Sequence, residues 1–402
     1  MCVNRGSINN SYVINQLMKR SVLMSVTLET IKELAISKGF DVVGVTNADN
    51  FERDEIEALK RIRDGHMDGY SWYNEERVKK MNRPSELLED AQSIISLACS
   101  YLGDSADSSD TLNGRIARYS WGDDYHRVLK KRIADFCADL SELVDIELKL
   151  RIFVDDGPMN DRAAARRSGV GWVGKNTNIL TPSHGSWVLL GQVITNLPLP
   201  SDLPLKKSCG NCVRCIDDCP TGAIVAPYVI DNKRCISYLT IELKGVIPRD
   251  LRPLMGDWIF GCDICQDVCP VNLKALPGHL EEFKQRNGFS TPELVPILEM
   301  DQVTFSDRYK NSPIKRTKLV GLQRNACVAL GNNGDKKAIL PLSKALCSSE
   351  ESVVRLHAAW AIGRIGGREA ATVLERAGDS ESDAAVLEEI ILSLEELSLI
   401  HI

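Results

Sequence analysis

The sequence predicts an α+β protein in three parts. These are a sandwich of strands and helices, a bacterial two-cluster ferredoxin-like domain, and a C-terminal tail of α-helical HEAT-like repeats. Three observations lead to this division: apolar strands alternate with amphipathic helices up to about residue 204, eight of the 13 cysteines fall between Cys209 and Cys269, and residues 321–402 repeat internally. A chain of 402 residues has room for two or three such units.

The composition is that of an ordinary soluble globular protein, with 44% hydrophobic and 26% charged residues. It excludes a wholly disordered chain, a collagen and a coiled-coil rod. The net charge of −6 provides no global basic field for nucleic acid, although a local basic patch is still allowed. No run approaches the ~18 apolar residues that a membrane-spanning helix needs, so we expect no membrane association.

Residues 1–23 lack the long apolar core and the small-residue cleavage site of a secretory signal. Periodic sequence begins only at Met24. We therefore expect a disordered extension at residues 1–23 and a cytoplasmic protein, because thiols stay reduced in the cytoplasm.

The first folded part, residues 24–204, carries alternating helix and strand signals. Apolar residues recur at helical spacing from Thr27 until Lys38-Gly39 ends the pattern. Later segments have the short apolar runs of buried strands or the periodicity of helices. The sequence thus predicts helices at 27–37, 125–148 and 162–168, and strands at 42–45, 91–101, 152–154 and 186–195.

The second part, residues 205–275, contains two cysteine runs. The first, Cys209-x-x-Cys212-x-x-Cys215-x-x-x-Cys219-Pro220, matches the bacterial ferredoxin run, whose fourth cysteine serves the other cluster. The second run, Cys262-x-x-Cys265-x-x-x-Cys269-Pro270, lacks its leading cysteine, and Cys235 can replace it. By symmetry one 4Fe–4S cluster takes Cys209, Cys212, Cys215 and Cys269, and the other takes Cys219, Cys235, Cys262 and Cys265.

A pair of zinc sites is the alternative for these cysteines. Zinc would need two independent sets of four ligands, and a three-residue gap before Cys-Pro is not expected of it. We expect the other cysteines, Cys2, Cys99, Cys137, Cys327 and Cys347, to be apolar fillers or incidental.

Residues 276–320 form a connecting segment, and residues 321–402 form the repeats. Arg308–Arg324 carries six basic residues and no acidic one. In the tail, Arg324–Gly331 matches Leu356–Gly363, 32 residues further on, which is typical of stacked two-helix units. One unit cannot bury its own apolar face, so we expect the stack to pack against the cysteine-rich domain. The alternative is a coincidental pair of Ala-rich helices.

The first part must hold whatever the clusters reduce. It contains no Gly-x-Gly-x-x-Gly after a strand and no Gly-x-x-x-x-Gly-Lys-Ser/Thr. Polar and glycine-rich residues collect instead in three segments, 114–126, 154–158 and 169–178.

Taken in order, these motifs resemble the epoxyqueuosine reductase family. They are Tyr-Ser-Trp-Gly-x-Asp-Tyr-His ending at His126, Val-Asp-x-Gly-Pro ending at Pro158, Gly-Trp-x-Gly-Lys-Asn ending at Asn176, the two cysteine runs and the repeats. The resemblance covers about residues 25–400. It implies an enzyme that reduces epoxyqueuosine to queuosine at the wobble position of tRNA, with base-off cobalamin between the first two parts and electrons arriving from an external reductant through two 4Fe–4S clusters.

The resemblance also implies that Asp155 is the catalytic acid and a corrin contact. Removing an epoxide oxygen as water consumes two electrons and two protons, so a positioned acid is required beside the electron source. A free aspartic acid has a pKa near 3.9, and holding its proton at pH 7 costs about 4 kcal/mol, which burial against an apolar corrin face could supply. The alternative is an Asx turn or cap in Asp155-Asp156-Gly157-Pro158, in which Asp156 is a turn residue.

Four further positions, Ala117, Ile179, Leu190 and Ser237, align with residues that line the corrin in the family. Ile179 and Leu190 are equally compatible with plain core positions. The family's arginine before a proline is displaced here to Arg83, so the corrin-contacting arginine stays open. We expect His126 to be a structural hydrogen-bonding residue more readily than a cobalt ligand.

The RNA partner would be the anticodon stem-loop, whose unpaired wobble base can enter a pocket. The basic segment and the repeats are a plausible cradle for it, with Lys315, Arg316 and Lys318 on the phosphates and Lys244 near the pocket. The alternative is a solvated basic loop. We expect a monomer, and we retain two other functions: an electron-transfer ferredoxin without its own substrate, and another cobalamin–iron–sulfur reductase such as a reductive dehalogenase.

Overall fold

The computed structural model describes residues 27–104 and 110–400, so the prediction for residues 1–23 lies outside the described residues. Its centre is a four-stranded sheet in the order β1-β2-β7-β4, in which every neighbouring pair is antiparallel. The strands are β1 (Val42–Asn47), β2 (Ser93–Ser100), β7 (Val188–Thr195) and β4 (Leu150–Phe153). All four predicted strands are therefore present, within two or three residues at each end.

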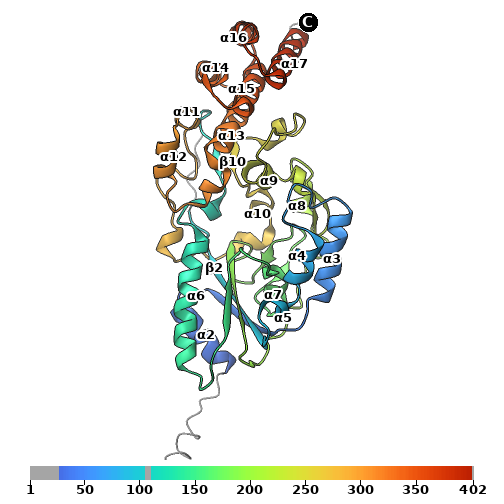
Figure 1. The fold of residues 1–402 in the computed structure, drawn as a ribbon, viewed down its shortest axis with the longest axis vertical. Coiled ribbons are helices and arrows are strands. Elements are labelled where there is room, and N and C mark those ends of the chain that lie inside the picture. The colour runs from blue at the N-terminus through green and yellow to red at the C-terminus, as the bar shows by residue number, and fades with distance from the viewer. Residues whose placement is uncertain (1–26, 105–109, 401–402) are drawn as a thin grey trace, which may run out of the picture.

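Central strand β2 is buried along its whole length because both faces of the sheet are covered. Ile95, Leu97 and Cys99 pack with helices α2 (Leu28–Ser37) and α6 (Tyr125–Glu142). Ile94 and Ala98 point the opposite way, toward the side of α7 (Asp161–Arg167), as the two-residue period of a strand requires. Figure 1 shows α2 and α6 along one face, and α7 with α3 (Glu52–Arg63), α4 (Glu75–Met81) and α5 (Pro84–Leu87) on the other.

One prediction for this part needs correction, and three of its helices, α3, α4 and α5, were not predicted. Helix α6 ends at Glu142 rather than at residue 148, because Val144 and Leu148 turn away from the helix and pack against the core as the chain enters β4. Helix α3 was not predicted, because its surface is mostly polar and Ala58 is its one buried residue. Its acidic first turn and basic last turn were the available signal.

The cysteine-rich part has short elements joined by turns. They are α8 (Arg214–Asp217), the hairpin β8 (Ile224–Ala226) and β9 (Val229–Ile230), α9 (Ile236–Ile241), β10 (Trp258–Phe260) and α10 (Ile264–Asp267). Strand β10 pairs in parallel with β3 (Arg115–Ile116), which comes from the first part. The segment that precedes the Tyr-Ser-Trp motif is thus attached directly to the chain that leads into Cys262.

The tail extends away from the sheet (Figure 1). The two matching octapeptides lie on α13 (Lys318–Asn333) and α15 (Ser352–Ile365), each followed by a partner helix, α14 (Ile339–Ser348) or α16 (Arg368–Gly378), and α17 (Ala384–Ile400) ends the stack. The repeated glycine permits close helix packing, because a Cβ on Gly331 would lie 2.8 Å from the Cα of Ala361.

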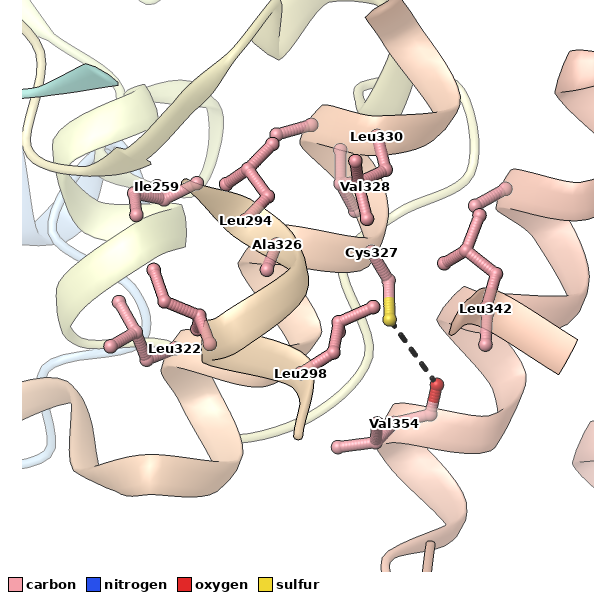
Figure 2. Packing of buried hydrophobic residues seen from close by; sticks show 14 of the residues in the cluster. Ile259, Leu294, Leu298, Leu322, Ala326, Cys327, Val328, Leu330, Leu342 and Val354 are labelled. Carbon is pink, nitrogen blue, oxygen red and sulfur yellow. Dashed lines mark hydrogen bonds between the residues drawn. The ribbon is translucent and has the colours of Figure 1, made fainter. Parts of the chain in front are cut away.

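The tail and the cysteine-rich part share one hydrophobic core, as predicted. In Figure 2, Ala326 on α13 lies toward Ile259 and Leu294, where Leu294 begins α11 (Leu294–Leu298), whereas Cys327 lies toward Leu342 and Val354. Cys327 is fully buried among these side chains, which is the apolar role expected of it. Among the described residues, no helix is long and apolar enough to cross a membrane.

A candidate iron–sulfur and catalytic site

The structure gathers eight thiols of the cysteine-rich part into two neighbouring sets. Cys215 interacts electrostatically with Cys209, Cys212 and Cys269. In the second set, Cys262 interacts with Cys235 and Cys219, and Cys265 interacts with Cys262 and Cys235. Cys265 also interacts electrostatically with Cys215, a member of the first set, so the two sets adjoin.

The two sets differ in their exposure. Cys212 is exposed, so the first set lies near the protein surface. Burial raises the pKa of Cys215 to about 11, and neighbouring thiols add to this effect. Burial raises the pKa of Cys262 and Cys265 further still. The second set is therefore the deeper one, and its thiolates need compensating positive charge, which a metal cluster provides.

The glycine-rich segment 169–178 holds both sets against the first part of the chain. Asn176 Nδ2 donates to the carbonyl oxygen of Cys265 over 3.1 Å, and Lys175 Nζ donates to the carbonyl oxygen of Gly210 over 2.8 Å. On the other side of α10, Gln266 Nε2 donates to the hydroxyls of Tyr101 and Ser186 at 3.0 Å each. These buried amides fix the cysteine runs relative to the sheet.

Asp155 lies just beyond the end of β4, in a turn that presents its carboxylate. Its φ of 49° is in the left-handed region, which aspartate and asparagine tolerate better than most residues. The hydroxyl of Tyr125, the first residue of α6, donates to Asp155 Oδ2 over 2.5 Å. Asp156 faces the other way: its Oδ1 accepts from the backbone N–H of Val154, and its Oδ2 pairs with Lys130.

Aromatic and charged side chains, here called the Asp155 shell, border this exposed carboxylate. The Tyr119 ring lies 6.0 Å from that of Tyr125 and 6.1 Å from that of Phe260, and the pKa of Tyr119 is raised by burial and by the charge of Asp155. Burial lowers the pKa of Arg316, but the charges of Glu242, its ion-pair partner at 2.6 Å, and of Asp155 raise it overall. The Asp155 turn, α6, β10 and the basic segment therefore meet at one place.

The four predicted corrin positions lie in two different environments. Ala117 is buried beside the chain that enters Cys262: a Cβ on Gly261 would lie 2.5 Å from its Cβ. Ser237 is on α9, two residues after Cys235. Ile179 instead belongs to a small apolar cluster against which Leu190 packs, an arrangement typical of core residues.

The four predicted RNA contacts fall into two groups, one exposed to solvent and one with partners within the chain. Lys315 and Lys318 are exposed. Arg316 is paired with Glu242, and Lys244 Nζ donates to the carbonyl oxygens of Ile241 (2.7 Å) and Arg316 (2.9 Å). Arg316 and Lys244 thus have partners within the chain, at the edge of the Asp155 shell.

Arg324, the last of the six basic residues in Arg308–Arg324, does not face solvent. Its side chain is fully buried and donates to the carbonyl oxygens of Leu239, Leu243 and Gly245 at 2.7, 2.7 and 2.8 Å. These carbonyls belong to the end of α9 and the turn after it, where a positive charge is favoured. The guanidinium of Arg324 therefore lies in the core, where it satisfies backbone carbonyl oxygens, and it adds no positive charge to the surface.

Sequence reasoning missed Tyr119, Tyr125, Arg77 and Glu242. The tyrosines stand in the motif quoted above, where attention went to His126, whose Nδ1 lies 2.8 Å from Asp124 Oδ1. Arg83, the displaced arginine, pairs with Glu55 at 2.9 Å. Arg77 is the side chain that reaches the Asp155 turn, because its Nη2 donates to the carbonyl oxygen of Gly157 over 2.9 Å.

Three family models match separate parts of the chain. The model described as a 4Fe-4S double cluster binding domain matches residues 208–272, the one described as epoxyqueuosine reductase QueG matches residues 82–156, and the one for HEAT repeats matches residues 320–395. They confirm the predicted double-cluster part and the predicted repeat tail.

Several proteins that are similar to this chain over most of their length are named epoxyqueuosine reductase. The epoxyqueuosine reductase of Bacillus cereus is 38% identical over 91% of this chain and 96% of its own, and that of Escherichia coli K12 is 37% identical over 86% and 92%. A solved epoxyqueuosine reductase with a tRNA-Tyr epoxyqueuosine-modified stem loop is 34% identical, with a TM-score of 0.86 over 92% of this chain and 98% of that one. This chain belongs to the epoxyqueuosine reductase family.

Proposed function

We propose that this protein reduces epoxyqueuosine to queuosine at the wobble position of tRNA, as an oxidoreductase of queuosine biosynthesis. One observation carries the proposal: a chain of this family holds two adjoining sets of four thiols and a turn that presents Asp155. The overall change is the loss of the epoxide oxygen as water with formation of a carbon–carbon double bond. It consumes two electrons and two protons.

Two 4Fe–4S clusters fit the thiols. We assign one cluster to Cys209, Cys212, Cys215 and Cys269, and the other to Cys219, Cys235, Cys262 and Cys265. Backbone N–H groups around these sulfurs support the assignment: the N–H of Ala223 donates to Cys219 Sγ over 3.3 Å, which is the kind of contact that tunes a cluster. The three-residue gap before Cys-Pro in each cysteine run favours clusters over zinc.

We propose that cobalamin, when bound, is held between the deeper thiols and the Asp155 turn. Ala117 and Ser237 adjoin cysteines of the deeper set, and the missing side chain of Gly261 permits the close approach at Ala117. The buried Oδ1 of Asp161, which lies close enough to Asp155 to interact with it, has no hydrogen-bond partner in the structure and is available to an amide of the cofactor. Bound cobalamin would supply electrons one at a time. Ile179 and Leu190 would support the site through packing.

Asp155 is the proposed proton donor to the leaving oxygen. The hydroxyl of Tyr125 fixes the orientation of its carboxyl group, and Asp155 itself is exposed, so its proton can reach a bound substrate. A solved Bacillus subtilis epoxyqueuosine reductase, 34% identical to this chain with a TM-score of 0.85, has a catalytic aspartate loop swung out of its active site. The turn of Asp155, held by Arg77 through Gly157, is our candidate for the same loop.

The RNA partner is the anticodon stem-loop of a tRNA carrying epoxyqueuosine. Lys315 and Lys318, which are exposed, are the proposed phosphate contacts. Arg316 and Lys244, at the edge of the Asp155 shell, are the proposed contacts to the loop itself. We further propose a monomer in the cytoplasm, where tRNA is modified, with electrons from an external reductant entering at the exposed first set of thiols.

The test is anaerobic reconstitution with iron, sulfide and cobalamin, followed by incubation with a reductant and tRNA that carries epoxyqueuosine. We expect mass analysis of the digested nucleosides to show queuosine. Parallel reactions that omit cobalamin or the reductant should leave epoxyqueuosine unchanged. Persistence of epoxyqueuosine in the complete reaction, with both clusters loaded, would contradict the proposed function.

A further inference from the structure

The turn between α3 and α4 carries an aromatic group that the reaction does not use. Tyr70, Trp72 and Tyr73 lie in contact: the ring centroids of Tyr70 and Trp72 are 5.1 Å apart, and those of Trp72 and Tyr73 are 5.7 Å apart. Trp72 is 45% exposed, whereas the other five tryptophans of the chain are buried. A tryptophan left open to solvent in a tight aromatic group is a feature that binding sites share.

The aromatic turn, residues 70–73, is anchored on one side to the Asp155 turn. The guanidinium of Arg77 lies 4.8 Å from the centre of the Trp72 ring, and its Nη2 donates to the carbonyl oxygen of Gly157 over 2.9 Å. Gly157 is two residues from Asp155. One arginine therefore links the exposed ring to the turn that carries the proposed proton donor.

On its other side the aromatic turn is anchored to the cysteine-rich part. The Tyr70 ring meets the Tyr238 ring edge to face at 5.2 Å, and a Cβ on Gly69 would lie 1.9 Å from the Tyr238 hydroxyl. Asp68 pairs with Lys233 at 3.0 Å. The turn thus spans from the Asp155 turn to helix α9, and its position is fixed at both ends.

Charges of both signs surround the aromatic group, with Asp68, Glu75 and Glu76 on the acidic side. Burial raises the pKa of Tyr70, and Glu242 raises it further while Arg316 lowers it, so the tyrosine adjoins the same ion pair that borders the Asp155 shell. Burial also raises the pKa of Tyr73, and the charges of Arg162 and Arg61 lower it. A hollow of about 320 Å³ beside the rings is lined by Ile62, Met67, Asp68, Gly69, Tyr70, Ser71 and Tyr73.

We propose that Trp72, backed by Arg77, is a stacking platform for an unpaired base of the RNA loop, next to the nucleotide that enters the Asp155 site. The proposal rests on the proposed function. An aromatic face amid arginines suits single-stranded RNA, because every base has a face that can stack and the arginines attract its phosphates. Its place at the edge of the catalytic turn suits a base adjacent to the one being modified.

The experiment compares Trp72→Ala and Trp72→Phe with the wild type in binding to an unmodified anticodon stem-loop RNA at several salt concentrations. We expect Trp72→Ala to weaken binding about 5- to 150-fold and Trp72→Phe to retain most of it, because a phenyl ring still stacks. The salt dependence should not change, since no phosphate contact is lost. Ile146→Ala, which changes an exposed apolar residue in the loop before β4, is the control and should bind normally.

Unchanged affinity of Trp72→Ala for the stem-loop would overturn the platform. If the same variant also lost cobalamin on reconstitution, seen as absent corrin absorbance, the ring would be assigned to the cofactor. Conversion of epoxyqueuosine is measured separately: a wild type that binds the stem-loop through Trp72 but forms no queuosine would contradict the proposed function and leave the platform intact.

Discussion

The hydroxyl of Tyr125 donates a 2.5 Å hydrogen bond to the carboxylate of Asp155. The two residues are placed by different means. Tyr125 begins α6, whose first turn is capped by Asp124, and its ring stacks on His126 at 4.0 Å. Asp155 stands in a turn with positive φ after β4. A helix start and a turn thus meet at one carboxylate, and the orientation of that carboxylate depends on both.

Tyr125→Phe removes this hydrogen bond and leaves the ring. Hydrogen bonds to charged groups contribute about 1.5–3 kcal/mol, so we expect kcat for queuosine formation to fall about 10- to 150-fold. The KM for tRNA and the cobalamin content should stay at wild-type values, because the hydroxyl bonds to Asp155. Single-turnover rates with preloaded enzyme measure the effect, and a wild-type rate would show that Tyr125 does not position the acid.

Asp155→Asn tests the acid itself. Asparagine tolerates positive φ, so the turn should keep its shape while losing its ionisable group. We expect normal iron and cobalamin content and normal stem-loop affinity, with queuosine formation lost. Asp156→Asn is the matched control and should retain most activity, because Asp156 faces Lys130 and the backbone of Val154. Normal turnover in Asp155→Asn would defeat the assignment.

Much of this arrangement could be predicted from local sequence, because its signals are local. The cysteine spacings and the short apolar run of β2 lie within short windows. The contact between Tyr125 and Asp155 could not be predicted, since 30 residues and two elements separate the pair. The end of α6 depends on where Leu148 packs, and periodicity alone does not contain that information.

The direction in which the Arg324 side chain points could not be predicted from the sequence either. A basic residue in a basic stretch is normally solvated, yet this one is buried, because the carbonyl oxygens at the end of α9 replace water around it. Arg316, in the same stretch, faces Glu242 and the Asp155 shell. Count and sign of charge could be read from the sequence, but the direction of each side chain depends on helices that meet only in the fold.

Arg324→Met should destabilise the protein because it leaves buried carbonyl oxygens at Leu239, Leu243 and Gly245 without donors. We expect the free energy of unfolding to fall by about 3–5 kcal/mol. Chemical denaturation of the apoprotein measures this. Arg308→Met, which changes an exposed arginine of the same segment, should shift the midpoint little. Equal stabilities of the two variants would contradict the structural role of Arg324.

Lys315→Ala combined with Lys318→Ala should weaken tRNA binding and reduce its salt dependence. Each lost phosphate contact lowers the slope of log K against log salt by about 0.7–0.9. Filter binding across a salt series measures the slope. Lys131→Ala with Lys149→Ala removes two exposed lysines from the first part of the chain and serves as the control. If the slope stays at the wild-type value, the segment is a solvated basic loop.

Stability at acid pH should depend on Glu381. Arg355 donates to both of its oxygens, at 2.7 and 3.0 Å, and lowers its pKa to about 2. The unfolded pKa is about 4.3, so the unfolded chain binds more protons, and this stabilisation is lost as pH falls from about 4.3 toward 2.

We therefore expect the unfolding midpoint of the wild type to fall more steeply over that range than that of Glu381→Gln. Glu375→Gln, at an exposed position on α16, should keep the steep dependence. Parallel curves for the wild type and Glu381→Gln would contradict the ion pair's contribution.

Metal and sulfide quantification of the protein purified without oxygen tests the central claim most directly. The account predicts about eight irons and eight sulfides per chain, and one cobalt after cobalamin is added. Substitution of Cys235 by Ala should remove about four irons and leave the first cluster in place. Zinc in place of iron, or a full iron content that Cys235→Ala does not change, would contradict the account.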